Sequence, residues 1–256
     1  MFPYFTLFER IITLYQIMVL AGVFSVGIYA TSVGKHYAIN SIDIICFLLL
    51  VSIGIIFGSH ILFIIINVKE LFYSVSPINK MIQLFFSGSV FYGGLIGGVL
   101  TAYIFRFKFN NVDKIIYVVT PSIPLFHFFG RVGCFFTGCC FGIESNIGFT
   151  FKHSLIEIAN NVKRFPVQLV EALFNLILFL ILHSFIKKGY LKNKLLWVYM
   201  LCYSFMRFFI EFFRGDTYRG IWFCLSTSQI ISFVLFVIAL LKLFTILISY
   251  LRPIQK

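Results

Sequence analysis

The chain has 256 residues, of which 60% are hydrophobic and only 12% are charged. A soluble globular domain carries about 25% charged residues, so this chain has too few charges to cover a surface in water. The composition excludes a soluble domain and predicts an integral membrane protein in the lipid bilayer. The formal net charge of +12 does not indicate a nucleic-acid partner, because Lys and Arg are scattered over short connectors and form no basic arm or stripe.

Seven apolar segments are long enough to cross a bilayer, since about 20 helical residues span its hydrocarbon core. They cover residues 11–30, 41–66, 88–107, 112–129, 167–186, 194–213 and 225–249. We predict an all-α integral membrane protein, a bundle of about seven transmembrane helices that forms one domain over residues 1–256. The most polar interval, residues 141–166, should be an excursion into water.

The first apolar segment follows Arg10, as the apolar core of a signal peptide would. It is longer than such a core, and no Ala-x-Ala-like cleavage site follows it. We therefore expect a retained helix. Seven spans place the termini on opposite sides, and the connectors around Lys108 and Lys188 make the C-terminal side the more basic one. Because Lys and Arg are enriched in cytoplasmic loops, we expect an outer N-terminus and a cytoplasmic C-terminus.

The third segment contains the run Tyr-Gly-Gly-Leu-Ile-Gly-Gly at residues 92–98. Glycines four residues apart on one helical face allow a second helix to approach closely. The same glycines would also let a lipid headgroup come near the backbone. The sequence leaves both interpretations open.

The stretch from His127 to Gly142 combines a charged residue with four glycines. Arg131 lies among apolar residues, where a guanidinium is costly unless it has an anionic partner or a wet cavity. Its planar fork of donors suits a phosphate group. The glycines permit an irregular backbone, which membrane depth tolerates only where it is buried or lines a cavity. The alternative is that Arg131 extends from a helix end to the membrane surface.

The same stretch holds three of the six cysteines, Cys134, Cys139 and Cys140. The pattern Cys-x4-Cys-Cys is not a usual metal-ligand spacing and has no convincing partner histidine nearby, so we expect no metal. A disulfide in an exposed loop is one alternative, and small packing residues are another. The remaining cysteines stand alone in apolar segments and are expected to be small buried hydrophobes. They are Cys46, Cys202 and Cys224.

A polar stripe lies in the sixth segment, where four side chains follow each other at spacings of four, four and three residues. They are Tyr203, Arg207, Glu211 and Arg214. These spacings place all four on one helical face, which should point into the bundle and away from acyl chains. An internal salt bridge is one explanation. Two arginines for one glutamate also leave spare positive charge, which would attract an anionic ligand.

Two further polar positions lie near helix starts. Tyr15 lies inside the first segment. Gln168 and Glu171 follow Arg164-Phe165-Pro166 and fall in the first turn of the fifth segment, where they would bind a ligand or cap the helix.

Six motifs occur in a fixed order along nearly the whole chain. They are the Tyr15 segment, Gly93-Gly94, Gly-Arg-x-Gly-x-Phe-x-x-Gly at 130–138, Pro-Val-Gln-Leu-x-Glu at 166–171, Arg-Phe-x-x-Glu-Phe-x-Arg at 207–214 and Ser-Thr-Ser-Gln at 226–229. In this order they resemble the prolipoprotein diacylglyceryl transferase family. Members of that family are bacterial plasma-membrane proteins of seven spans.

The resemblance implies an enzyme without a metal or organic cofactor. Such an enzyme moves the diacylglyceryl group of phosphatidylglycerol onto the lipobox cysteine thiol of a preprolipoprotein, which forms a thioether and releases glycerol 1-phosphate. The implied partners are phosphatidylglycerol and the lipobox peptide. The alternatives are a related phospholipid-dependent transferase with another acceptor and a lipid-binding, non-catalytic homologue.

The chain departs from the family's pattern at four positions. Tyr92 replaces the usual His, and Cys134, Thr137 and Cys139 replace the usual Asn, Asn and Glu. The chain therefore resembles a divergent branch with the pattern Gly-Cys-Phe-x-x-Gly-Cys-Cys.

We expect four residues to carry the chemistry. Arg131 and Arg207 would converge on one phosphate, and Glu211 would hold Arg207. His127, one helical turn before Arg131, would act as the base. Tyr92 is poorly suited to that role, because its phenol has a reference pKa of about 10. The alternative is that His127 donates a hydrogen bond to a carbonyl left unpaired near Pro124. The residues expected to bind substrate are Tyr15, Tyr92, Gly93, Gly94, Gly133, Gly138, Gly142, Gln168, Glu171, Tyr203 and Arg214.

Overall fold

The computed structural model describes residues 4–7, 10–72, 76–109, 111–154, 156–216, 221–222 and 225–251. The chain forms two compact units, Met1–Ala30 with Ile116–Lys256, and Thr31–Ile115. The prediction of one domain over residues 1–256 stays a prediction.

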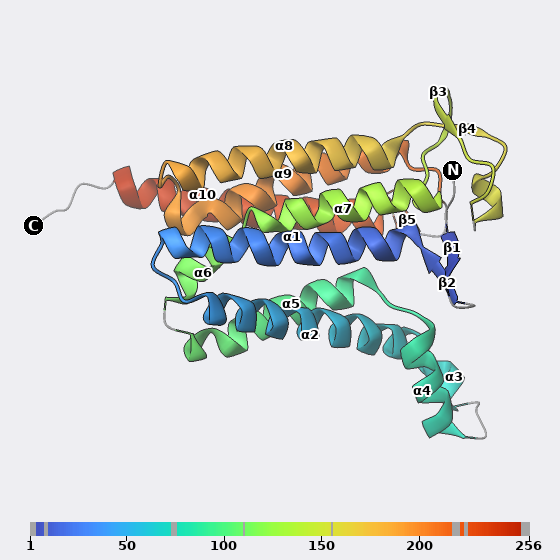
Figure 1. Ribbon diagram of the computed structural model, residues 1–256, viewed down its shortest axis with the longest axis horizontal. Coiled ribbons are helices and arrows are strands. Elements are labelled where there is room, and N and C mark those ends of the chain that lie inside the picture. The colour runs from blue at the N-terminus through green and yellow to red at the C-terminus, as the bar shows by residue number, and fades with distance from the viewer. Residues whose placement is uncertain are drawn as a thin grey trace, which may run out of the picture. The chain divides into compact units, whose positions relative to one another are not determined.

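Long apolar helices make up most of the first unit, and they run side by side in Figure 1. They are α1 (Leu14–His36, in this unit as far as Ala30), α7 (Ser122–Thr137), α8 (Val167–Lys187), α9 (Leu195–Ile210) and α10 (Thr227–Leu251). α7 packs on α8, and α9 packs on α10. The short helix α6 (Val112–Val119) precedes α7, and Pro121 between them lacks the N–H that a continuous helix would need.

Short strand pairs and 3-10 turns occupy the ends of these helices. The antiparallel pairs are β1 (Tyr4–Leu7) with β2 (Arg10–Thr13), β3 (Glu144–Thr150) with β4 (Lys163–Arg164), and β5 (Ile221–Trp222) with β6 (Leu225–Ser226). The 3-10 turns are η2 (Glu157–Ala159), η3 (Lys192–Lys194) and η4 (Glu211–Phe213). Between α7 and α8, Phe135, Phe141, Phe151 and Ala159 form a small buried core under the β3–β4 hairpin.

The second unit consists of α2 (Ser41–Ile66), α3 (Val68–Phe72), α4 (Pro77–Ser87), α5 (Phe91–Phe105) and the 3-10 turn η1 (Arg106–Lys108). Glycines allow α2 and α5 to cross closely. A Cβ at Gly93 would collide with the carbonyl oxygen of Gly58, and a Cβ at Gly97 would collide with that of Gly54. The close helix approach expected from the glycine spacing is therefore confirmed.

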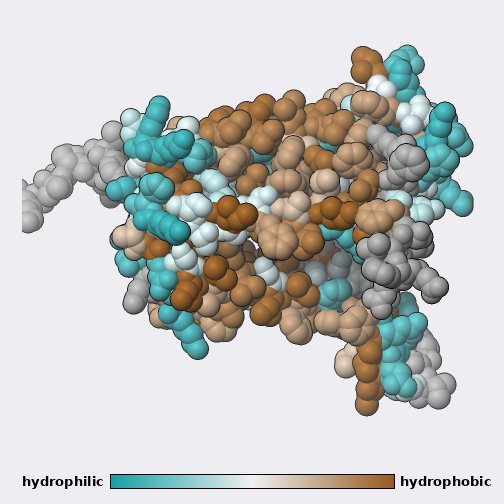
Figure 2. All heavy atoms as spheres, viewed as in Figure 1, coloured by the Kyte–Doolittle hydropathy of each residue, from teal (hydrophilic) through white to brown (hydrophobic). Residues whose placement is uncertain are grey.

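In the part of the chain that the structure describes, six helical segments are long and apolar enough to cross a membrane, with α6 and α7 counted together as Val112–Thr137 and α9 and η4 as Leu195–Phe213. The helix α4 with the segment Tyr92–Lys108, bent by 91°, would make a seventh span. The predicted all-α membrane architecture is confirmed. Figure 2 shows hydrophobic residues along the middle of the first unit's helices and hydrophilic residues at their ends. Exposed side chains such as Leu173 on α8 and Phe233 on α10 fit contact with lipid.

The third predicted span, residues 88–107, differs most from the structure. The helix α5 has 15 residues, which is about 22 Å at 1.5 Å per residue and shorter than a hydrocarbon core of about 30 Å.

Two cysteine predictions also need comment. Cys46 on α2 is exposed, not buried, because an apolar side chain on a lipid-facing surface needs no cover from protein. Cys224 lies outside the described residues.

Candidate functional site

A buried ionic network joins three helices of the first unit. Glu171 of α8 is 1% exposed, and its carboxylate contacts two arginines from different helices. Arg131 of α7 places Nη2 2.9 Å from Oε1, and Arg207 of α9 places Nη1 3.6 Å from Oε2. Arg131 and Arg207 therefore converge, as expected. The group on which they converge is a carboxylate of the chain itself.

Glu211 completes the network from the end of α9. Its Oε2 lies 2.6 Å from Nη2 of Arg207, so the predicted i,i+4 pair is confirmed. Both side chains are buried, whereas Phe205 and Phe209 on the opposite face are about half exposed. The polar stripe of α9 faces the interior because solvation by acyl chains would be far less favourable.

The Ser226–Gln229 motif also serves this network. The Gln229 side chain accepts a hydrogen bond from the Ser226 backbone N–H at 2.9 Å, and the Ser226 hydroxyl accepts one from the Gln229 N–H at 3.2 Å. This reciprocal pattern is a capping box at the start of α10. The Ser226 hydroxyl also lies 3.1 Å from Oε1 of Glu211. The motif thus fixes the helix start and the orientation of Glu211 together.

Arg214 forms a separate ion pair beyond the end of α9. Its Nε donates to Oδ1 of Asp216 at 2.9 Å, and its Nη2 donates to Oδ2 at 2.7 Å. With Asp216 and Glu171 counted, three arginines face three carboxylates among the described residues. The expectation of spare positive charge is therefore wrong. It counted Glu211 as the one carboxylate for Arg207 and Arg214, whereas Glu171 of α8 and Asp216 of the loop also pair with arginines.

Two guanidinium atoms in this region remain without a hydrogen-bond partner among the described residues. They are Nη1 of Arg214 and Nη1 of Arg207, both buried, and the Arg207 atom keeps only its 3.6 Å ion pair with Glu171. An unsatisfied buried donor costs about 1–3 kcal/mol, and more when it is charged. Such donors are suited to an anionic ligand that would satisfy them.

His127 lies between side chains of α8 and α9. The Tyr199 hydroxyl is 3.3 Å from Nδ1 of His127, and the ring centroids of His127 and Tyr203 are 5.0 Å apart. Asn175 of α8 lies near the imidazole, and its Nδ2 donates to the Glu171 carbonyl at 2.8 Å. The described contacts of His127 are thus with side chains and not with a carbonyl near Pro124, so the orientation of the ring is fixed beside Arg131.

Tyr199 and Asn175 are buried polar residues near the site that the motifs did not single out. Tyr199 continues the stripe of α9 at the same spacing of four, and Asn175 lies four residues after Glu171 on α8. The period of the helix was therefore the signal that would have found both residues.

Tyr15 reaches the site at the start of α1. Thr13 and Gln16 form a second capping box, with hydrogen bonds of 3.0 and 3.3 Å. The next turn of α1 packs on α7 at Gly133, where an added Cβ would lie 3.2 Å from the Tyr15 Cα. The Tyr15 phenol is within electrostatic range of Arg131. Gly133 therefore acts here by allowing two helices to approach.

Gln168 and the glycines position the loop after α7. Gln168 donates from Nε2 to the Cys139 carbonyl at 2.8 Å, and its Oε1 is buried with no hydrogen-bond partner among the described residues. A Cβ at Gly142 would collide with the Phe165 carbonyl oxygen. Gly142 also pairs with Arg214 in an antiparallel bridge, which ties this loop to the end of α9.

The helix-capping interpretation of Gln168 and Glu171 is wrong. The side chain of Gln168 binds the loop, and that of Glu171 binds arginines. Glu171 lies beyond the first turn of α8, which begins at Val167.

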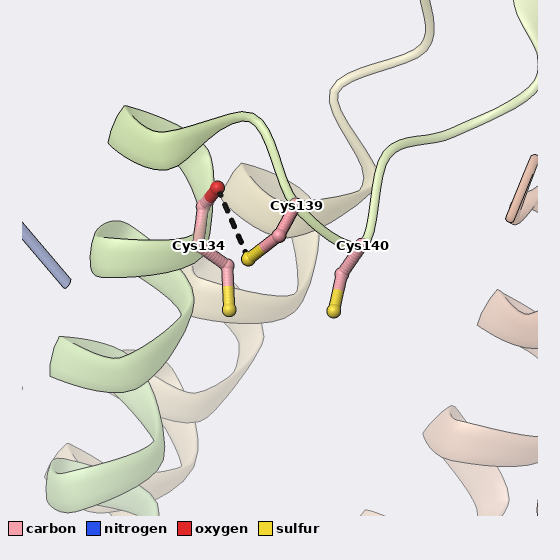
Figure 3. Close-up of side chains that lie close together, drawn as sticks. All are labelled: Cys134, Cys139 and Cys140. Atoms are coloured by element: carbon pink, nitrogen blue, oxygen red, sulfur yellow. Dashed lines mark hydrogen bonds between the residues drawn. The ribbon is translucent and has the colours of Figure 1, made fainter. Parts of the chain in front are cut away.

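Three thiols lie beside the arginine network. The sulfur atoms of Cys134, Cys139 and Cys140 are all within 4.8 Å of one another, and none of the three forms a disulfide (Figure 3). The neighbouring thiols of Cys134 and Cys139, together with the nearby Arg214 and Arg131, hold the pKa of the Cys140 thiol below its usual value.

The structure therefore gathers most of the candidate residues in the first unit. Tyr92, Gly93 and Gly94 belong to the second unit, where Gly93 and Gly94 face α2. Helix packing accounts for these two glycines, and a substrate contact of Tyr92, Gly93 or Gly94 stays a prediction.

Comparison with known proteins identifies the family. Residues 4–245 match the family model described as prolipoprotein diacylglyceryl transferase. The chain belongs to the prolipoprotein diacylglyceryl transferase family. The matched range contains every candidate site residue named above, so the resemblance expected from the ordered motifs is confirmed.

Curated relatives carry the same description. A phosphatidylglycerol–prolipoprotein diacylglyceryl transferase of Clostridium tetani is 32% identical over 231 residues, which cover 89% of this chain and 90% of the relative. Transferase 2 of Clostridium perfringens is 34% identical over 221 residues, 85% of this chain and 84% of the relative. The Rickettsia bellii transferase is 34% identical over 214 residues, 80% and 77% of the two chains.

Proposed function

We propose that this chain transfers the diacylglyceryl group of phosphatidylglycerol to the lipobox cysteine thiol of a preprolipoprotein. Family membership over residues 4–245 and the names of the curated relatives support the reaction class. The structural observation that carries the proposal is the buried network in which Arg131 and Arg207 meet at Glu171.

The network would bind the phosphate of the lipid. Nη1 of Arg214 makes no hydrogen bond among the described residues, and Nη1 of Arg207 faces the Glu171 carboxylate at 3.6 Å, too far for a hydrogen bond. A phosphodiester accepts hydrogen bonds from such atoms and satisfies them. The carboxylates of Glu171, Glu211 and Asp216 hold the three guanidinium groups in place before the lipid arrives, so little reorganisation is needed as charge develops.

The chemical step would be a substitution at the glycerol carbon. The thiolate sulfur forms a bond to that carbon while the bond from carbon to the phosphate ester oxygen breaks, and the electron pair leaves with glycerol 1-phosphate. Arg131 and Arg207 would stabilise the developing negative charge, an effect of about 3 kcal/mol for one well-placed donor. His127, held by the Tyr199 hydroxyl, would accept the thiol proton.

We further propose that the chain resides in the bacterial plasma membrane with an outer N-terminus and a cytoplasmic C-terminus. The basic connectors around Lys108 and Lys188 support this orientation.

A second candidate function is a phospholipid-dependent transfer to another acceptor, or lipid binding without catalysis. The departures at Tyr92, Cys134 and Cys139 favour it, because they change residues on which the usual family pattern depends.

Complementation separates the two candidates. The chain, expressed in a bacterium depleted of its own transferase, should restore growth and lipoprotein lipidation, whereas an Arg207→Lys variant at equal abundance should not, since an ammonium cannot reproduce the fork of donors. Membrane insertion without lipidation would contradict the proposal and support the second candidate.

A further inference from the structure

Cys134, Cys139 and Cys140 form a thiol cluster that the proposed phosphate-binding residues leave unused. Their sequence spacing argued against a metal site, but the fold brings their sulfur atoms within 4.8 Å of one another. Figure 3 shows the Cys134 side chain, from the end of α7, and the Cys139 and Cys140 side chains, from the following loop, pointing into the same space.

The end of α7 creates this arrangement. Gly138 adopts the left-handed conformation with φ 73°, and the Cys139 N–H bonds back to the Cys134 carbonyl at 3.1 Å. The chain therefore reverses direction and places the two loop cysteines over the last turn of the helix. Gln168 anchors the Cys139 carbonyl, and the Thr137 hydroxyl lies 3.4 Å from the Cys139 sulfur. Gln168 of α8 and Thr137 of α7 thus both hold the loop at Cys139.

The sulfur separations are near those of a metal site. A zinc–sulfur bond is about 2.3 Å, so two thiolates on one zinc ion lie about 3.8–4.0 Å apart. Sulfur atoms within 4.8 Å need to approach each other by less than about 1 Å to reach that geometry. Three thiolates with a divalent ion carry one net negative charge, and Arg131 and Arg214, which also pair with Glu171 and Asp216, are within electrostatic range of Cys140 and attract it.

The three thiols would leave one coordination position open on a four-coordinate ion. Among the described residues, no His, Cys, Asp or Glu side chain joins the three thiols as a fourth ligand. Zinc sites with three protein ligands keep the fourth position open for water or substrate, whereas structural sites fill it. A thiol that occupies the position loses its proton outright.

We propose that Cys134, Cys139 and Cys140 bind a thiophilic divalent ion such as Zn²⁺, and that its open position binds the acceptor thiol as a thiolate. The binding of the acceptor thiol at the open position rests on the proposed function. The ion would supply thiol activation in this chain, where Tyr92 and Cys139 stand in place of the His and Glu of the usual family pattern, and His127 would take up the released proton.

Co²⁺ titration of the reduced, metal-free full-length protein in detergent tests the site. One equivalent should produce sulfur-to-cobalt charge-transfer absorption, which Cys134→Ser and Cys140→Ser should abolish. Cys202→Ser is the matched control, because Cys202 lies on α9 outside the cluster, and it should bind normally. Absence of the absorption in the wild type, or equal absorption in all four proteins, would overturn the metal site.

The wild-type protein supplies a second measurement that does not depend on the folding of variants. Zn²⁺ should slow alkylation of Cys134, Cys139 and Cys140 but not of Cys202, as read by mass spectrometry. Equal alkylation with and without Zn²⁺, or a disulfide within the cluster after purification without reductant, would contradict the proposal.

A lipobox peptide tests the open position. The cysteine peptide should shift the absorption of the Co²⁺ protein, and the same peptide with serine should not. An unchanged spectrum with the cysteine peptide would overturn the assignment of the acceptor. Because these titrations need no phospholipid, a failure of metal binding and a failure of lipid transfer are separate results.

Discussion

Replacement of Glu171 by glutamine should destabilise the bundle more than any single substitution of an exposed carboxylate. The side chain is buried and contacts Arg131 at 2.9 Å and Arg207 at 3.6 Å. At an effective dielectric constant of 20 these pairs attract by roughly 6 and 5 kcal/mol, and desolvation of the three groups offsets much of that energy. Loss of the carboxylate charge leaves the Arg131 guanidinium without its anionic partner inside the bundle. We therefore expect Glu171→Gln to lower the free energy of unfolding by about 3–5 kcal/mol.

Two control variants isolate the cause. In Arg131→Leu/Glu171→Leu, Arg207 keeps its 2.6 Å pair with Glu211, and no buried charge loses its last partner. This double variant should stay within about 2 kcal/mol of the wild type. Glu144→Gln changes an exposed carboxylate of β3 and should have an effect within about 0.5 kcal/mol.

The assay is unfolding by dodecyl sulfate in mild-detergent micelles, followed by circular dichroism. A Glu171→Gln protein with the wild-type midpoint would refute the view that this carboxylate joins α7, α8 and α9. A double variant that is less stable than the single one would refute the electrostatic explanation and indicate a loss of packing.

Three further predictions follow from local geometry and charge. Gly138→Ala should lower the free energy of unfolding by more than about 1 kcal/mol, because φ is 73° and the new Cβ would lie 2.5 Å from the Ser154 Oγ. The control Gly189→Ala, at φ 68° in open space, should lower it by less. Equal losses of stability in thermal melts would contradict the steric argument. His127→Gln keeps hydrogen bonding but removes proton transfer, so lipidation of a peptide should fall by roughly 10²-fold or more at unchanged abundance; near-normal turnover would exclude the base role. A reporter fused at Lys256 should be active as a cytoplasmic reporter, and activity as a periplasmic one would refute the proposed orientation.

Local periodicity was enough to predict the parts of the site that lie on one helix. The i,i+4 spacing of Arg207 and Glu211 predicted their ion pair, and the glycines at 93 and 97 predicted a close helix crossing. The partner of Arg131 was not predictable in this way, since Glu171 lies 40 residues away on another helix and only the packing of α7 on α8 brings them together.

The loop after α7 shows a second limit of sequence reasoning. Gly138 is a typical residue for the end of a helix, yet the spacing Cys-x4-Cys-Cys does not reveal that a left-handed turn there folds Cys139 and Cys140 back over Cys134. The Arg214–Asp216 pair was not predictable from helical periodicity, because its two residues are two positions apart and helical neighbours are three or four apart.

Transfer of lipid to a lipobox peptide by the purified chain tests the central claim most directly. The protein, reconstituted in vesicles that contain phosphatidylglycerol, should convert the peptide to its diacylglyceryl thioether and release glycerol 1-phosphate. The peptide mass should increase by that of the diacylglyceryl group less the one hydrogen that it replaces. Vesicles of phosphatidylcholine alone, and the Arg207→Lys variant in phosphatidylglycerol, are the controls and should give little product. Conversion that requires both phosphatidylglycerol and the arginine is the result we predict. A folded wild-type protein that leaves the peptide unmodified in phosphatidylglycerol vesicles would contradict the proposed function.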